Sequence, residues 1–350
     1  MSEKLRLAFD DLLARRDLSE EQTDEALREV FERQPPATLV AGFLVALRLK
    51  GETGAELTGA ARAMLAVARP LELNERRLLD TAGTGGDGQG TLNISTAAAL
   101  VASAAGARVA KHGNRAVSGR CGGADVLEYL GVKLDPGPAG LRKCLDRAGF
   151  CFVFAPAYHP LMARLAPLRR ELAVRTLFNL LGPLANPARP HRQLTGVAQR
   201  QLLLPMAQAL AALGAEHALV VNSDDGLDEI SARAPTQVIE VNAGEVAREF
   251  RIHPAELISD YPAADEPIEA ADPAEAAALL KRTLAGEADS ARAVVALNAG
   301  AAIYVGGQAD SLAEGVAKAD TVLRLGQALE VLEALRLASQ ETVPTDELDS

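Results

Sequence analysis

The apolar pattern of this 350-residue chain changes near residue 70. Before it, apolar residues recur at helical spacing, as in Leu5–Leu13 and Ala37–Leu49, and no segment is typical of a strand. After it, short apolar runs alternate with helix-length segments, which favours an α/β domain. The sequence therefore predicts a small N-terminal helical domain (residues 1–70) beside a large α/β domain (71–340), with a mostly parallel central sheet and flanking helices, and a disordered tail (341–350).

The expected elements of the larger domain can be placed individually. Strands are expected at Leu78–Asp80, Arg108–Ala110, Phe150–Phe154, Ala218–Val221, Val238–Val241 and Val294–Leu297, with helices at Ser95–Ala105 and Pro160–Val174. The short spacings between Ile230 and Phe250 indicate an antiparallel pair.

Composition excludes several classes of protein. A formal net charge of -11 argues against a nucleic-acid partner. The three cysteines form no CxxC pair, which argues against a cysteine-ligated zinc site and suits a reducing compartment. The N-terminus lacks the apolar core of a signal peptide, and the longest weakly polar run, Ile94–Ala107, is too short to cross a bilayer. We expect a cytoplasmic protein with no membrane partner.

A basic, glycine-rich block lies in the middle of this acidic chain. Between residues 83 and 120 the only acidic side chain is Asp87, whereas four Lys or Arg residues and eight glycines occur there. Glycine lets backbone N–H groups approach a ligand, and such groups beside cations form an anion cradle. The block predicts a phosphate-rich ligand.

Two common phosphate motifs do not explain the block. Residues 83–88 fit the dinucleotide-binding pattern G-x-G-x-x-G, but Lys111–Arg115 stands where that fold needs an acidic residue for the ribose. The Walker A pattern is excluded because the block lacks its lysine. Thr91–Thr96 instead opens an Ala-rich helix, and a helix N-terminus beside a glycine loop is a phosphate site. The alternative is that Asn93 or Ser95 only caps this helix.

A family resemblance rests on several motifs in order: GTGGD (83–87), NIST (93–96), KHGNR (111–115), GADVLE (123–128), RRELAVRT (169–176), FNLLGPLANP (178–187) and DGLDEI (225–230). Together they resemble the anthranilate phosphoribosyltransferase family over essentially the whole chain. The resemblance implies a helical domain, completed near residues 165–190, that meets the α/β domain at an active-site hinge. It also implies a homodimer formed through the helical domain.

The implied reaction transfers a phosphoribosyl group from phosphoribosyl pyrophosphate (PRPP) to the amine of anthranilate, in tryptophan biosynthesis. The aromatic amine is neutral near pH 7, so no strong general base is required, and the task is to position and neutralise the departing pyrophosphate. The implied PRPP residues are Gly83, Gly86, Asp87, Thr91, Asn93, Ile94, Ser95, Thr96, Lys111, His112, Gly113, Asn114, Arg115, Ala116, Val117, Ser118, Gly119 and Gly123. The implied anthranilate residues are Gly83, Asn114, Arg169 and Pro183, and the implied Mg²⁺ ligands are Ser95, Asp228 and Glu229.

Each assignment has a simpler alternative. The acidic run from Asp224 to Glu229 could be a solvated turn before an element near Ser231. Arg169 could be a surface arginine on a charged helix, where Glu171 and Arg175 would form an i,i+4 pair.

The chain also departs from the family pattern. Gly119, Cys121 and Gly123 stand where the family commonly has serines, and Val221–Ser223 stands where it often has His-Gly. Rival functions are a nucleoside phosphorylase of the same fold and a non-catalytic relative that binds nucleic acid.

Overall fold

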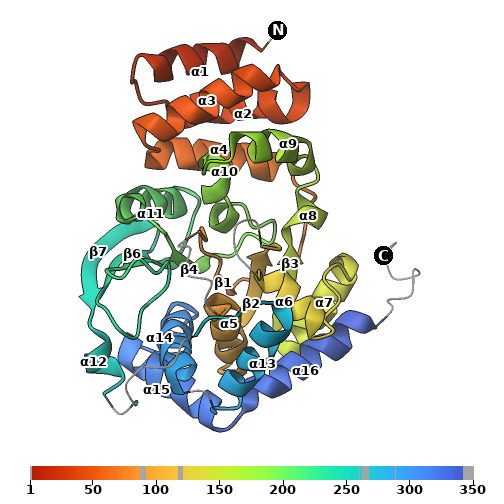
Figure 1. The fold of residues 1–350 in the computed structure, drawn as a ribbon, viewed down its shortest axis with the longest axis vertical. Helices are drawn as coiled ribbons and strands as arrows, with labels where there is room; N and C mark the ends of the chain where they lie inside the picture. Colours follow the sequence, from red (N-terminus) through yellow and green to blue (C-terminus); the bar gives the residue numbers. More distant parts are fainter. Residues whose placement is uncertain are drawn as a thin grey trace.

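Four helices form the N-terminal end of the molecule in the computed structural model, which describes residues 2–86, 92–116, 121–259, 261, 268–287 and 289–341. They are α1 (Glu3–Leu13), α2 (Glu20–Arg33), α3 (Ala37–Lys50) and α4 (Gly54–Ala66), and they stack above the rest of the chain (Figure 1). Ser19 begins α2 with a capping box, because its Oγ accepts from Gln22 N at 3.1 Å and its own N–H donates to Gln22 Oε1 at 2.8 Å. Ser19 thus fixes the start of α2.

A seven-stranded sheet with the order β3-β2-β1-β4-β5-β6-β7 forms the centre of the larger part. Its strands are β1 (Leu78–Asp80), β2 (Arg108–Gly113), β3 (Phe150–Phe154), β4 (Arg192–Gly196), β5 (His217–Ser223), β6 (Thr236–Asn242) and β7 (Glu245–Ile252). The first five strands pair in parallel, and β5, β6 and β7 pair antiparallel. The predicted fold class, including the mostly parallel sheet and the antiparallel pair after Ile230, is confirmed.

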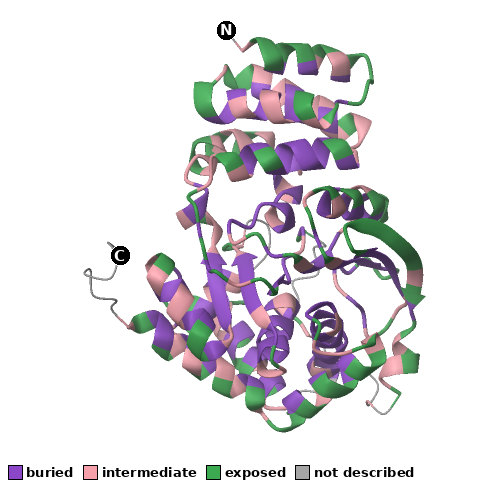
Figure 2. Ribbon diagram, turned by 180° about the vertical axis from the view of Figure 1, so that it is seen from behind, coloured by how far each residue is buried: buried purple, intermediate pink, exposed green. Residues whose placement is uncertain are grey.

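Helices cover both faces of this sheet. One face packs against α5 (Ile94–Ala104), α6 (Gly123–Tyr129), α7 (Gly137–Ala148), α13 (Pro273–Leu284), α14 (Asp289–Val305), α15 (Leu312–Arg324) and α16 (Gln327–Gln340), and β5 and β6 meet α11 (Leu203–Ala212) on the other face. Side chains alternate across a strand, so Leu219 and Val221 of β5 join the first group while Ala218 and Val220 face α11. The buried strands lie inside the helices, with the exposed edge strand β7 at the rim (Figure 2).

The core of the helical domain includes segments that come much later in the chain. Helix α10 (Leu177–Leu180) and α11 share one hydrophobic cluster with α1–α4, and the rings of Phe31 and Phe178 lie 6.1 Å apart. Apolar residues of α9 (Met162–Leu172) pack against the same cluster. Short helices α8 (Ala155–Tyr158) and α12 (Pro254–Leu257) and single 3₁₀ turns at Gly182–Leu184 and Arg200–Leu202 complete the connections.

The strand predicted at Val294–Leu297 is wrong, because these residues lie inside α14. All four side chains are at most 2 % exposed. A short run buried on every side is compatible with either a buried strand or a buried helix, so its apolar pattern does not separate the two. Strand β4 was not predicted, because only one residue of its RQLTG sequence is strongly apolar.

Across the described ranges, no helix combines the length and the apolar character needed to span a membrane.

Candidate active site

The glycine loop lies where the chain reverses its direction across the sheet. From β1 the chain adds β2 and then β3 on one side, and β4 returns to the other side of β1. In open α/β sheets, ligands bind beyond the carboxyl ends of the strands at this switch point. The loop follows β1 directly, and Thr84 N donates to Gly196 O, at the end of β4, at 2.9 Å. The loop therefore spans the β1/β4 switch point.

Lys111 of β2 points into the protein and connects this loop with the start of α5. Its Nζ donates to Thr81 O at 3.1 Å, to Thr81 Oγ1 at 3.2 Å and to Ser95 Oγ at 3.1 Å. Burial lowers the pKa of the ammonium group, and the negative charges of Asp80 and Glu229 oppose that shift. Three donors are thus used inside the protein, where the lysine orients Ser95.

Asp80, the last residue of β1, balances the charge of Lys111. Its Oδ1 accepts from the N–H groups of Ala82 and His112, both at 3.1 Å, and its Oδ2 accepts from Asn186 Nδ2 at 2.9 Å. Burial raises the pKa of this carboxyl to about 6, which still leaves it ionised at pH 7. Sequence reasoning missed the roles of Asp80, which ends the predicted strand 78–80, and of Asn186, which stands within the FNLLGPLANP motif.

The acidic run after β5 is not a uniformly solvated turn. Asp228 is only 8 % exposed, and its Oδ2 lies 3.6 Å from the position that a Cβ on Gly83 would occupy. Asp224 and Asp225 are exposed, and Asp225 accepts a hydrogen bond from Ser231 Oγ at 2.6 Å. The run therefore divides into two outward carboxylates, one that lies against the glycine loop and the half-buried Glu229.

Ser95, Asp228 and Glu229 carry side-chain oxygens of the kind that Mg²⁺ prefers. Glu229 is close enough to Lys111 to raise the pKa of that lysine, and Lys111 contacts Ser95. Within the described residues, no group of three or more His, Cys, Asp or Glu side chains could hold a metal ion by itself. Magnesium commonly takes one or two carboxylates and completes its shell with water and substrate phosphates. The donors present fit a metal that binds together with a phosphorylated ligand.

The start of α5 keeps two buried polar atoms unsatisfied. Asn93 Nδ2 donates to Cys121 O at 3.1 Å, but Asn93 Oδ1 and Thr96 Oγ1 have no hydrogen-bond partner among the described residues. A Cβ on Gly123 would lie 2.8 Å from Thr96 Oγ1, so a serine there would have to displace the threonine. This packing explains the departure from serine at residue 123. Ile94 belongs to the buried core.

Arg115 is paired within the protein. Its guanidinium donates to both carboxylate oxygens of Glu128, at 2.6 and 2.8 Å, and to Asp125 at 3.2 Å, and these carboxylates raise its pKa. Asp125 also accepts from the N–H groups of Ala116 and Gly122, at 3.0 and 2.9 Å. The GADVLE motif thus holds both ends of the loop after β2.

His112 and His159 form an edge-to-face pair with ring centroids 5.3 Å apart. His112 Nδ1 donates to Gly182 O and His159 Nε2 donates to Ala185 O, both at 2.8 Å. Burial lowers the pKa of each imidazole to about 4, so both are neutral at pH 7. A neutral buried pair supports a positioning role for His112.

Arg169 and Arg170 are neighbours on α9 with different surroundings. Arg169 is half-buried, burial lowers its pKa, and its guanidinium makes no hydrogen bond or ion pair with the described part of the chain. Arg170 is exposed. A partly desolvated cation without a protein partner is suited to receive an anion.

Pro183 and Asn114 are the remaining predicted acceptor residues. Pro183 is buried, and a Cβ on the preceding Gly182 would lie 3.9 Å from Gly83 O. Asn114 is exposed just beyond β2, and its Oδ1 accepts from Arg115 N at 2.7 Å. Gly113 packs so closely on Phe152 that a Cβ would lie 2.6 Å from that ring.

Comparison with known proteins identifies the family. The glycosyl transferase family helical bundle domain matches residues 8–68, and the glycosyl transferase family a/b domain matches residues 75–329. The anthranilate phosphoribosyltransferase of Alkalilimnicola ehrlichii is 46% identical over 93% of this chain and 96% of its own length. The chain belongs to the anthranilate phosphoribosyltransferase family.

Solved structures of anthranilate phosphoribosyltransferases have the same fold. The Thermus thermophilus enzyme superposes with a TM-score of 0.86 at 42% identity, covering 95% of this chain and 99% of that one. The Saccharomyces cerevisiae enzyme, in complex with PRPP and Mg, gives 0.84 at 26% identity, covering 96% and 97%.

Arg175 contacts the glycine loop, which sequence reasoning missed. Helix α9 ends at Leu172, and Ala173 has a left-handed φ of 50°, so Arg175 is not one helical turn from Glu171. Its Nη2 donates instead to Thr84 O at 3.0 Å. The sequence contains no sign of this helix end, because Ala173 is neither Gly nor Asn, the residues that usually mark one.

Five residues predicted to bind PRPP lie outside the described ranges: Asp87, Thr91, Val117, Ser118 and Gly119.

Proposed function

We propose that this chain catalyses the transfer of the phosphoribosyl group of PRPP to the amino group of anthranilate, with release of pyrophosphate, in tryptophan biosynthesis. The observation that carries the proposal is the arrangement of charges around the switch point. Oxygen donors and the glycine loop lie together at the strand ends, and Arg169 is a half-buried cation without a partner in the described chain.

The reaction needs only modest acid–base chemistry. The bond between ribose C1 and the pyrophosphate oxygen breaks, and the amine nitrogen of anthranilate forms the new bond to C1 and then loses a proton. Positive charge develops on the ribose while negative charge develops on the leaving group, so stabilising the pyrophosphate is the main requirement. When bound, Mg²⁺ would neutralise part of that charge. Ser95, Asp228 and Glu229 would hold it.

To bind PRPP, the phosphoribosyl donor, the chain would use the backbone N–H groups of the glycine loop and of the residues around it. We propose that the residues from Gly83 to Thr96 and from Lys111 to Gly123 that the motifs assign to PRPP contact it. Lys111 would act by orienting Ser95 and by adding a buried positive charge, since its three N–H donors already have protein partners.

On the acceptor side, Arg169 would hold the carboxylate of anthranilate through two parallel hydrogen bonds. Pro183 would contact the aromatic ring, and Gly83 and Asn114 would complete the pocket. His112 would keep Gly182 beside the glycine loop through its 2.8 Å hydrogen bond.

The test is the consumption of anthranilate, followed by its fluorescence. Loss of fluorescence should require PRPP and Mg²⁺ together, should stop on addition of EDTA and should resume with excess Mg²⁺. If PRPP is not consumed, or if the protein instead cleaves a nucleoside with phosphate, the proposal is wrong.

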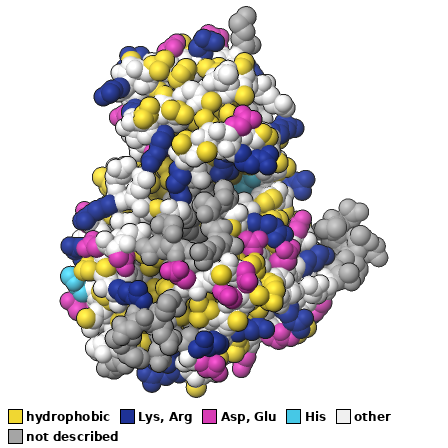
Figure 3. Space-filling model, viewed as in Figure 1, with side chains coloured by type: hydrophobic (Ala, Val, Ile, Leu, Met, Phe, Trp, Pro, Cys, Tyr) yellow, Lys and Arg dark blue, Asp and Glu magenta, His cyan; other side chains and the backbone are white. Residues whose placement is uncertain are grey.

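We further propose a cytoplasmic homodimer with domains over residues 1–70 and 71–340, residues 165–190 completing the first. Residues 342–350 of the predicted tail lie outside the described ranges. Leu7 and Leu13 of α1 are 56% and 63% exposed, Leu49 of α3 is 82% exposed, and hydrophobic side chains gather on this domain (Figure 3). Packing of α10 with α1–α4 supports the added segment. The three cysteines are free, as suits the cytoplasm. Light scattering of the parent and of a Leu7→Glu, Leu49→Glu variant tests the dimer.

A further inference from the structure

Glu52, just beyond the end of α3, carries a buried carboxylate that the described chain leaves without hydrogen bonds. Its side chain is 1% exposed, and neither oxygen has a hydrogen-bond partner among the described residues. The nearest cation is Arg48, with Nη1 3.9 Å away. Burial raises the pKa of the carboxyl. A buried charge with so few partners is costly to the fold, so its placement calls for a specific reason.

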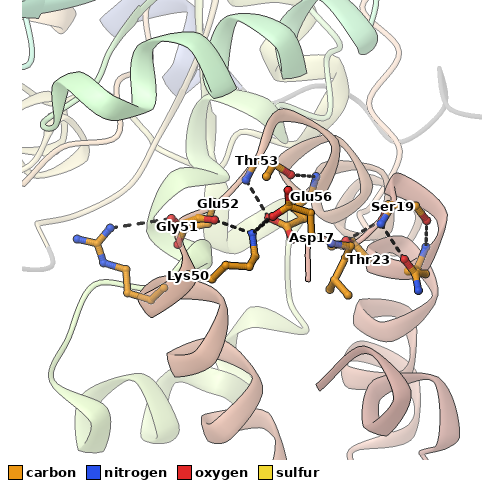
Figure 4. Close-up of polar contacts among 11 residues, drawn as sticks. Asp17, Ser19, Thr23, Lys50, Gly51, Glu52, Thr53 and Glu56 are labelled. Atoms are coloured by element: carbon orange, nitrogen blue, oxygen red, sulfur yellow. Dashed lines mark hydrogen bonds and ion pairs between the residues drawn. The ribbon is translucent and has the colours of Figure 1, made fainter. Parts of the chain in front are cut away.

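The neighbouring Glu56 shows how this domain normally satisfies a buried carboxylate. Its oxygens accept from Leu18 N at 2.9 Å, from Thr53 N at 2.8 Å and from Lys50 Nζ at 3.0 Å (Figure 4). Glu56 therefore stabilises the helical domain itself. Glu52 has no comparable set of donors, so its partner must come from outside this network.

A small cavity of about 10 Å³ lies beside Glu52, with room for about one water molecule. Glu52 and Arg48 line it from the helical domain. Arg175 and Thr176 line it from the segment between α9 and α10, and Gln199 lines it from the segment after β4. Glu52 and Arg175 thus line the same small, partly open cavity from separate segments of the chain.

Arg175 connects that cavity with the glycine loop. Its Nη2 donates to Thr84 O at 3.0 Å. A Cβ on Gly86 would lie 1.2 Å from Arg175 Nη1, so the guanidinium fills the space that any other side chain at residue 86 would need. Arg175 therefore supports the loop from the side of the helical domain.

We propose that Glu52 is a positioning residue for the glycine loop: through one water in the cavity, its carboxylate holds the Arg175 guanidinium against Thr84 and Gly86. The carboxylate thereby acquires the donor that the helical domain lacks, and the helical domain fixes the loop of the other domain. The consequence for binding rests on the proposed function, in which this loop receives PRPP.

The direct test is Glu52→Gln, which keeps the shape of the side chain and removes its charge. The KM for PRPP should rise about three- to thirty-fold, the range expected for a residue that acts through a neighbour, while the KM for anthranilate stays within about two-fold. The matched control is Glu29→Gln, since Glu29 is also a buried carboxylate of the helical domain but accepts from Leu5 N at 3.1 Å and does not line the cavity. An unchanged KM for PRPP in Glu52→Gln, or an equal rise in the control, overturns the proposal.

A double-mutant cycle with Arg175→Met tests whether Glu52 acts through the arginine. If it does, adding Glu52→Gln to Arg175→Met changes the KM for PRPP by less than about two-fold, because the effect is already lost. Multiplicative effects of the two substitutions contradict the coupling.

Hydrogen exchange without any substrate separates this inference from the proposed function. Amides of residues 81–86 should exchange faster in Glu52→Gln than in the parent and in Glu29→Gln, because the loop loses its support. Equal exchange in all three proteins refutes the positioning role, whatever reaction the protein catalyses.

Discussion

Asn298 of α14 holds Ile230, the residue directly after Glu229, by hydrogen bonds on both sides. Asn298 Oδ1 accepts from Ile230 N and Asn298 Nδ2 donates to Ile230 O, both at 2.9 Å. The asparagine is fully buried and also donates to Val294 O at 2.8 Å. Ser223 Oγ donates to Glu229 O at 2.7 Å from the other side. The backbone around the proposed metal carboxylate is therefore fixed from both α14 and β5.

Replacing Asn298 by Ala should loosen this turn and weaken Mg²⁺ use. The Ile230 N–H would be left buried without a partner, which costs about 1–3 kcal/mol of unfolding free energy. The Mg²⁺ concentration for half-maximal rate should rise, while the KM for anthranilate stays near that of the parent. Urea unfolding and a Mg²⁺ titration measure the two effects, and Asn242→Ala, at an exposed position of β6, is the control. An unchanged Mg²⁺ requirement in a destabilised Asn298→Ala protein would limit the asparagine to a role in folding.

The metal carboxylates themselves can be neutralised with little change of shape. Asp228→Asn combined with Glu229→Gln removes the charges that would hold Mg²⁺, so activity should fall and the half-saturating Mg²⁺ concentration should rise at least about ten-fold. Binding of Mn²⁺ in the presence of PRPP, followed by electron paramagnetic resonance, gives a readout that does not depend on turnover. Asp224→Asn and Asp225→Asn, at the exposed end of the same run, should leave both measurements unchanged.

Arg169→Ala should separate the two substrates. Loss of a charge-assisted fork to a carboxylate costs about 2–4 kcal/mol, which is roughly a 30- to 1000-fold loss in kcat/KM for anthranilate. The KM for PRPP should change little, because the pyrophosphate would be held elsewhere. Steady-state kinetics with each substrate varied in turn measures the split.

Two controls sharpen the test of Arg169. Arg170→Ala changes the exposed neighbour and should behave like the parent. Aniline keeps the amine and lacks the carboxylate, so it should be a poor substrate for the parent and little worse for Arg169→Ala. Damage to PRPP binding with an intact KM for anthranilate would place the acceptor site elsewhere.

The His112–His159 pair should make the fold sensitive to mild acid. Each imidazole has a pKa of about 4 in the folded protein, below its ordinary value of about 6.5, so the unfolded chain binds more protons between these values. Stability is complete above about pH 6.5 and is lost as the pH falls towards 4, by on the order of 3 kcal/mol for one imidazole. The raised pKa of Asp80 acts in the opposite direction, because its folded carboxyl takes up a proton first.

Urea unfolding at pH 7 and pH 5 measures this loss. In His159→Gln the dependence on pH should be smaller than in the parent, because one depressed titration is removed. His253→Gln, at an exposed histidine, is the control and should keep the full dependence. Equal slopes in all three proteins would contradict the contribution of the buried pair.

Much of the sheet could be predicted because its strands are short, apolar and separated by helices. The predicted bounds of β1 and β3 match the structure. Phe150–Phe154 is continuously apolar, and Leu78–Asp80 is two leucines followed by the aspartate that ends the strand. Strand β4 was missed because it begins with Arg192 and Gln193, whose burial depends on neighbouring strands. Sequence windows contain no information about such neighbours.

In the candidate site too, features of local composition could be predicted and long-range contacts could not. Motif residues with an unusual composition, such as the glycine loop, could be identified from the chain alone. Asp80, Asn186, Asn298 and Arg175 could not, because each acts through contacts with residues far away in the sequence. The difference between Arg169 and Arg170 is also a difference of burial, which no local pattern contains.

The shared core of α1–α4 and α10 has a consequence for synthesis of the protein on the ribosome. About 110 residues separate Ala66, the end of α4, from Leu177, the first residue of α10. At about 5–20 residues per second, the four helices emerge on the order of 5–20 s before these partners. Their apolar faces stay uncovered by α10 and α11 for that time, so the first part of the chain to be made is not the first to finish folding.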